Sequence, residues 1–150
     1  MATTGIVNGT SLRIYLDLGA GLVAVAYATS CSIDMSRELR ESVTKDSTGG
    51  GQTGWRTVRA GQKSATISGE GLVAMDADTN TNHKPITDLF AAFADGTAIS
   101  WRVTTEVTGD DFLSGSGLMT NLSLNMGAEE DSTYSYTVEV NGTVYQGTEA

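Results

Sequence analysis

The chain has 150 residues, 39% of them hydrophobic, which suits one domain with a buried core. Nine Lys and Arg against eighteen Asp and Glu give a net charge of −9, and a field of this sign opposes tight binding of nucleic acid. One Cys and no apolar run of about 18 residues argue against a disulfide framework and against a membrane span.

Most of the chain has the pattern of β-strands. Apolar and polar residues alternate in 11–17, 99–104, 121–126 and 134–140, as in strands with one buried face. Leu22–Met35 and Ser64–Met75 read as two further strands, the second broken or bulged at Gly69 and Gly71. Asn141-Gly142 lies between two β-prone runs and predicts a hairpin turn. We therefore predict a mainly β fold, an antiparallel β-sandwich or partial barrel.

One segment, about 85–95, has a helical pattern instead. Its apolar residues fall at i, i+3, i+4 and i+7 and share one helical face: Ile86, Leu89, Phe90 and Phe93. Pro85 suits the first turn of a helix, where its missing N–H costs nothing. We predict one short flanking α-helix that packs onto the sheet by this face, with both Phe side chains in the core.

The segment 36–63 differs from the rest in charge. Between residues 37 and 63, six cations against three acids give +3, whereas two cations against thirteen acids give −11 in 64–150. Its Gly-rich centre has little to bury. We predict a long hairpin over about 36–63 that projects from the body and orders against a neighbouring subunit, because two strands alone are marginal in water. A solvated loop with incidental charge is the alternative.

Residues for catalysis or cofactor binding are sparse. His83 is the only histidine, and Cys31, the only thiol, falls in a strand pattern where we expect it to be buried and inert. Gly49–Gly54 matches a dinucleotide-binding pattern by letter, but strand-like residues follow it where the mechanism needs a helix. Neighbouring acids such as Asp110 and Asp111 read as solvated surface. We expect no enzyme, no metal site and no cofactor.

An ordered series of short motifs carries a family resemblance. The motifs are Ala28-Thr29-Ser30-Cys31-Ser32-Ile33, Thr44-Lys45-Asp46-Ser47, Gly54-Trp55, and Ala60-Gly61-Gln62-Lys63-Ser64 continuing to Leu72. This series resembles the tail tube (major tail) proteins of tailed bacteriophages, in the family described as TP901-like. The motifs cover about residues 10–75, and the length and layout agree over the whole chain. The link at Thr48–Thr53 is longer than the family pattern.

The resemblance implies a single tail-tube domain over 1–150, with 36–63 as a projecting interface arm. It implies a β-sandwich that assembles as hexameric rings, stacked into a hollow tube that conducts the viral genome during ejection. The protein would be made in the host bacterial cytoplasm and reside in the virion. Its partners would be copies of itself and other tail proteins (tape measure, tail terminator, and baseplate or tip), with DNA passing without tight binding and no membrane.

On this reading, two sets of residues carry the function. Six arm residues are assigned to contacts between stacked subunits: Arg37, Arg40, Lys45, Trp55, Arg56 and Arg59. A solvated side chain is the alternative for each Arg, and core packing for Trp55. Acids on the inner wall would repel DNA phosphates, and six copies at −9 carry −54 per ring. The candidate lumen-facing acids, expected on strands, are Asp17, Asp34, Glu70, Glu106 and Glu139.

A monomeric β-sandwich binding or adhesin-type module is the alternative function, since Thr, Gly, Asn and Tyr are abundant. Such a module would stay monomeric at every concentration and bind a ligand, whereas a tube subunit would form rings or filaments. An acid/base hydrolase would need two converging carboxylates in a pocket, and no spacing in the sequence indicates them.

Overall fold

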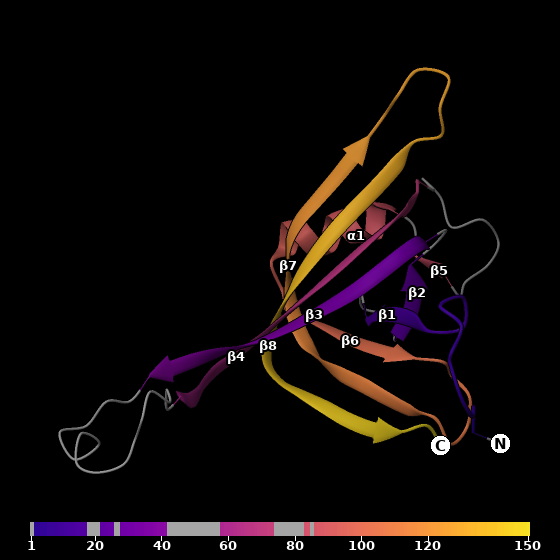
Figure 1. The fold of residues 1–150 in the computed structure, drawn as a ribbon. Helices are drawn as coiled ribbons and strands as arrows, with labels where there is room; N and C mark the ends of the chain where they lie inside the picture. Colours follow the sequence, from indigo (N-terminus) through magenta and orange to yellow (C-terminus); the bar gives the residue numbers. More distant parts are fainter. Residues whose placement is uncertain (1, 18–21, 26–27, 42–57, 74–82, 85) are drawn as a thin grey trace, which may run out of the picture.

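The computed structural model describes residues 2–17, 22–25, 28–41, 58–73, 83–84 and 86–150. These residues form one helix and eight strands (Figure 1). In chain order they are β1 (Arg13–Asp17), β2 (Leu22–Val25), β3 (Ala28–Glu41), β4 (Val58–Leu72), β5 (His83–Lys84), α1 (Ile86–Asp95), β6 (Ile99–Thr104), β7 (Asp111–Asn125) and β8 (Thr133–Thr148). The predicted mainly β fold with one short helix is confirmed. No helix in these ranges is long and apolar enough to cross a membrane.

All eight strands belong to one sheet, in the order β3-β4-β8-β7-β6-β1-β2-β5. Neighbours are antiparallel except β5, which pairs parallel with β2. The run predicted as one strand, Leu22–Met35, is two strands near opposite ends of this order. Val25 and Ala28 are only three residues apart, and their Cα atoms can be separated by at most about 11 Å. The open sheet must therefore wrap around, so that its two ends come close without forming a closed barrel.

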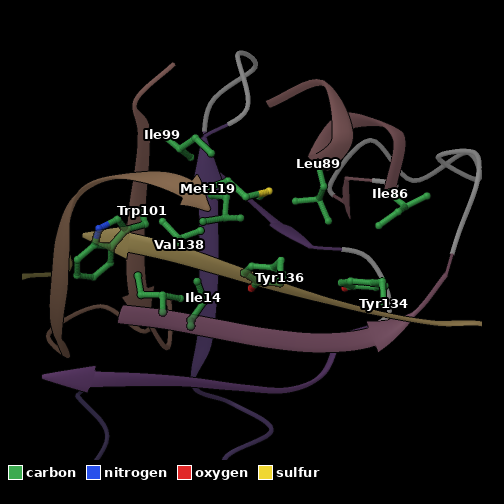
Figure 2. Packing of buried hydrophobic residues seen from close by; sticks show 11 residues of the cluster. Ile14, Ile86, Leu89, Ile99, Trp101, Met119, Tyr134, Tyr136 and Val138 are labelled. Carbon is green, nitrogen blue, oxygen red and sulfur yellow. The ribbon is translucent and has the colours of Figure 1, made fainter. Parts of the chain in front are cut away.

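The core lies on the inner face of this wrapped sheet, and the predicted alternation holds along β8, where Tyr134, Tyr136 and Val138 are buried. It fails in parts of two other predicted strands, since Tyr15 is buried and Leu12, Leu124 and Met126 are exposed. Trp101 is 1% exposed, and Leu16, Ile67 and Val138 are fully buried. Figure 2 shows Trp101, Val138 and Tyr136 lying along the same layer as Met119. Truncating a core aromatic of this kind to Ala typically costs about 3–5 kcal/mol.

Gly69 is not the predicted break in β4. The strand pairs without irregularity with β8 from Thr66 to Leu72, and Gly69 lies opposite Tyr136. A Cβ at position 69 would come within 2.6 Å of the Tyr136 ring, so the glycine makes room for a buried aromatic side chain. The register shift in this region lies on β3 instead, between Ala28 and Ser30.

The Asn141-Gly142 pair does not form a hairpin turn, so that prediction is wrong. β8 continues from Thr133 through Thr148 and pairs with β7 on both sides of the pair. The positive φ of Gly142, +94°, instead accommodates a bulge between Asn141 and Tyr145. The extra residues bend the strand while β7 remains its partner.

The helix prediction is right in extent and half wrong in packing. Ile86 and Leu89 are buried, as expected. Phe90 and Phe93, predicted to be in the core, are 62% and 42% exposed. The buried stripe of α1 is narrower than the apolar stripe of its sequence, because the helix touches the sheet along one line of side chains. An apolar helix face is therefore left on the surface.

Both chain ends are held at the loop between β6 and β7. The Thr3 N–H and the Thr105 hydroxyl donate to the Asp110 carboxylate, and the Glu149 N–H donates to the Asp110 carbonyl at 2.8 Å. The hydrogen bonds from Thr105 and then Thr3 lower the pKa of the Asp110 carboxyl, because they stabilise its charged form. This acid serves the fold, whereas the sequence indicated solvated surface.

Two buried tyrosines predict how stability depends on pH. Burial raises the pKa of Tyr134 to about 12 and also raises that of Tyr136, whereas both titrate near about 10 in the unfolded chain. Between these values the unfolded chain loses phenol protons that the folded protein keeps. The free energy of unfolding should therefore fall as the pH rises above about 10. Denaturant titrations at about pH 8 and pH 11 should show a smaller fall in the free energy of unfolding for Tyr134→Phe than for the unaltered protein. An equal fall in both proteins would contradict this prediction.

Candidate assembly interface

A two-stranded outer ribbon, residues 35–41 and 58–65, extends beyond the body of the sheet. β3 and β4 pair from Ala28↔Gly71 to Glu41↔Val58, but β8 pairs with β4 only from Thr66 to Leu72. Beyond Thr66 the two strands have only each other, and Figure 1 shows them projecting at lower left, away from α1. The described strands of the predicted 36–63 hairpin are thus present, and its tip lies outside the described residues.

The outer ribbon places like charges opposite each other. Arg37 faces Lys63, and Arg40 faces Arg59, in the register of β3 and β4. Like charges directly opposite across two strands destabilise the pairing. Arg40 has an ion pair with Glu38 at 3.8 Å, but the two side chains are 69% and 57% exposed, so the pair is worth at most about 1 kcal/mol. An anionic surface from another molecule would relieve this repulsion.

The outer ribbon carries three of the six predicted arm residues, with Arg37 on its core-side face and Arg40 and Arg59 on the opposite face. The other three, Lys45, Trp55 and Arg56, lie outside the described residues. Lys63 lies beside Arg37 on the core-side face of the ribbon, although the sequence alone did not single it out. The signal was present, since Lys63 belongs to the same basic segment, but its position opposite Arg37 depends on strand register.

A second surface is the polar face of the sheet, defined here as the side of β3, β4, β8 and β7 turned away from the core. Ile33, Ile67 and Val138 follow one another across three strands and face the core. Their strand neighbours point the opposite way. Three of the predicted lumen acids therefore share the polar face: Asp34, Glu70 and Glu139.

Hydrogen bonds across the strands confirm this placement of side chains. The Thr66 hydroxyl donates to Glu139 Oε2 at 3.2 Å, and the Ser30 hydroxyl donates to Glu70 Oε1 at 2.9 Å. Two serine pairs lie between them, Ser32 with Ser68 at 2.8 Å and Ser36 with Ser64 at 2.9 Å. Asp34 is in register with Thr66.

The rest of the polar face is almost entirely hydroxyl and amide. Thr137 and Ser135 on β8 lie opposite Asn121 and Ser123 on β7. Over 30–36, 64–70, 135–139 and 121–123, the described strands place no Lys or Arg on this side. Over these ranges the face is therefore hydrophilic and anionic, whereas Arg40 and Arg59 lie on the same side of β3 and β4 farther out, on the outer ribbon.

The other two predicted lumen acids lie elsewhere. Asp17 ends β1, which is separated from β8 by β7 and β6 in the sheet. Glu106 follows the end of β6, in a loop with φ of 60°, so the expectation that it lies on a strand is wrong. Cys31, predicted to be buried, is exposed, because β3 is an edge strand on which only Ile33 is partly covered.

Comparisons with known proteins agree with this geometry. A family model described as phage tail tube protein matches residues 6–146. Among solved structures, the tail of an empty GTA particle with C6 symmetry has a TM-score of 0.74 at 24% identity, over 93% of this chain and 98% of that chain. The virion of a native gene transfer agent has a TM-score of 0.75 at 23% identity, over 95% of this chain and 100% of that chain.

A third structure, the SPP1 tail tube, has a TM-score of 0.70 at 12% identity, over 96% of this chain and 80% of that chain. At these identities the likenesses show a shared fold. A comparison with curated proteins finds no significant match.

Proposed function

The chain belongs to the phage tail tube protein family, and from this premise we propose that six copies close into a ring and that rings stack into a conduit for the genome. The protein is a structural subunit of the tail tube, and its place is the virion tail. The fold of the C6 GTA tail supports six as the ring number. The main support for the proposal is the polar face, which is anionic and carries no Lys or Arg over residues 30–36, 64–70, 135–139 and 121–123.

Ring closure would use the exposed edge strand of the sheet, β3. β3 is an end strand of 14 residues, and its outer backbone groups have no strand partner among the described residues. An exposed edge of this length invites pairing with another chain. A head-to-tail contact that closes by rotation would cover this edge in every copy and leave a finite ring.

The polar face would line the inside of the ring. Three carboxylates in each of six copies, Asp34, Glu70 and Glu139, give eighteen per ring. DNA phosphates would be repelled by these acids and would meet mainly hydroxyl and amide groups around them, with Leu118 opposite Glu139 as an apolar exception. Such a wall lets a polyanion slide without holding it. Asp17 and Glu106 lie apart from this face, and we assign them no place on the wall.

The outer ribbon would connect one ring to the next. Its cations repel one another within a single copy, and a net charge of −9 leaves the body of a neighbouring copy anionic. We assign Arg37, Arg40 and Arg59 to this contact, and we extend the assignment to Lys45, Trp55 and Arg56 of the same segment. A stacking contact does not close on itself, so it propagates a tube.

We further propose that the protein has no catalytic role and needs no cofactor, which fits a family whose function is structural. Its remaining contacts would be with proteins at the two ends and inside of the tube, namely the tape measure, the tail terminator and the baseplate or tip. The 1–150 chain would act as a single tube domain.

Assembly against concentration tests the proposal directly. Purified protein should elute as a monomer or small oligomer when dilute and form rings or tubes, visible by negative-stain electron microscopy, when concentrated. A species that remains monomeric at every concentration would overturn the tube proposal and favour a monomeric binding module. Varying the salt concentration in the same experiment reports on the charged contacts, because salt screens exposed pairs.

A further inference from the structure

The exposed side of α1 has an apolar flank and, opposite it, an acidic flank. At 100° per residue, Phe90 and Phe93 lie on one flank of the helix, while Asp88 and Asp95 lie on the opposite flank. Phe90 is 62% exposed and Phe93 is 42% exposed. Soluble proteins seldom leave two phenyl rings one helical turn apart in water without a function.

The middle of this face is nearly flat. Thr87, Ala91 and Ala94 are all exposed and lie between the phenyl flank and the acidic flank. Short side chains allow a backbone to approach closely. The helix therefore has a shallow, smooth strip, which suits contact with an extended strand or ribbon.

A pocket adjoins the acidic flank. It has a volume of about 390 Å³ and is formed where α1 meets the ends of β1 and β6. Asp88 and Asp95 of the helix and Asp17 of β1 line it, and none of the described residues lining it is a cation. Asp17, predicted to face the lumen, instead belongs to this pocket.

One surface of the same chain has the matching pattern. On the core-side face of the outer ribbon, Met35, Arg37 and Leu39 follow each other at every second residue, and Lys63 lies opposite Arg37. Met35 is 58% exposed and Leu39 is 57% exposed. The ribbon thus offers apolar and cationic side chains where α1 offers apolar and acidic ones.

The two surfaces cannot meet within one molecule. The described part of the ribbon extends away from the body at lower left in Figure 1, whereas α1 lies behind the upper half of β7. The contact must therefore join two copies.

We propose that α1 and its acidic pocket are the docking site for the outer ribbon of a second copy. Met35 and Leu39 cover Phe90 and Phe93, and Arg37 and Lys63, on the same face of the ribbon, face the carboxylates of the pocket. The apolar part supplies the burial and the charges set the orientation. The inference rests on the proposed tube and names the surface that receives the ribbon.

Chemical cross-linking in assembled tubes tests this contact. In a Cys31→Ser background, which removes the only thiol, Leu39→Cys and Phe90→Cys are combined and treated with a short bis-maleimide linker. We expect covalent ladders of several copies on denaturing gels, since each copy would be linked through both its ribbon and its helix. The single variants should give dimers at most.

The matched control combines Leu39→Cys with Met126→Cys. The Met126 side chain is 75% exposed and lies just past the end of β7. Equal ladders from this control, or no ladder from intact tubes carrying Leu39→Cys and Phe90→Cys, would overturn the docking site. If the unaltered protein forms no tubes at all, the proposed function fails instead, so the two failures are distinguishable.

A substitution provides a second, independent readout. Phe90→Ser with Phe93→Ser should raise the concentration needed for tube growth at least tenfold, while Tyr145→Ser, which removes an aromatic ring that is 63% exposed on β8, should leave it unchanged. Since neither phenyl ring is buried in a single copy, circular dichroism should show an unchanged fold. Normal tube growth by the double Phe variant would contradict the proposal.

Discussion

Charge reversal in the outer ribbon should abolish tube growth and leave the isolated subunit as stable as before, or more so. Arg37→Glu and Arg59→Glu each replace a like-charge pair across the ribbon with an opposite-charge pair, because Lys63 and Arg40 lie opposite them. This change favours the ribbon within one copy. Between copies it turns attraction into repulsion on the surface that meets the anionic neighbour.

The expected loss of association free energy between rings follows from the number of charge contacts that the variant removes. At about 0.5 kcal/mol per exposed charge contact, the twelve contacts that two reversed charges in each of six ribbons remove would cost about 6 kcal/mol. That loss corresponds to about a 10⁴-fold weaker association. Sedimentation and negative-stain imaging measure assembly, and thermal unfolding measures the subunit.

The matched control is Arg13→Glu, compared with Arg59→Glu alone, since both remove one exposed cation and add one acid. Only the ribbon variant should stop growth. If Arg37→Glu with Arg59→Glu forms tubes of ordinary length, the ribbon does not join rings through its cations.

Reversing the charge of the polar face should turn the conduit into a DNA-binding tube. Asp34→Lys, Glu70→Lys and Glu139→Lys together change each copy by six charges, from three acids to three cations on one face. Tubes should still form, because in the proposed tube these side chains face the lumen and not a neighbour. Short duplex DNA should enter and stay, with an affinity that falls steeply as salt rises.

Protection from nuclease separates lumen from outer surface. DNA held by the Asp34→Lys, Glu70→Lys, Glu139→Lys tube should resist digestion. The control, Glu129→Lys with Glu130→Lys and Asp131→Lys, makes the same change in charge at the exposed turn after β7. DNA bound by the control tube should be digested. Loss of tubes on reversing the polar face would show that this face is an intersubunit contact.

Local periodicity was enough to predict most of the fold. The helix lies at Ile86–Asp95, within the predicted 85–95, because its apolar spacing is unlike that of a strand. The alternation around Trp101 identified a core strand, since Ile99 and Trp101 are buried and Val103 packs partly buried against the core. The basic segment correctly indicated a projecting hairpin, because a long polar run with a Gly-rich centre has no reason to pack on its own core.

The errors come from long-range partners that local patterns do not contain. Asn141-Gly142 has the composition of a tight turn, but β7 supplies a partner on both sides of it, and the glycine forms a bulge instead. Phe93 has core periodicity, yet α1 buries Ile86 and Leu89 and leaves Phe93 42% exposed. Cys31 lies in a strand as expected, but that strand is an edge.

The candidate surfaces depend on register even more strongly. Sequence alternation alone placed Asp34, Glu70 and Glu139 on strands but not on the same face, which required the pairings of β3, β4 and β8. The same pairings set Arg40 against Arg59. Asp17 had an equivalent strand position in the sequence, but it lies beside α1 because β1 is far along the sheet.

The most direct test is a cryo-electron microscopy reconstruction of tubes grown from the purified protein. The account predicts stacked six-subunit rings in which the side chains of Asp34, Glu70 and Glu139 line the central channel. A reconstruction in which these three carboxylates lie on the outer surface, or are buried between rings, would contradict it.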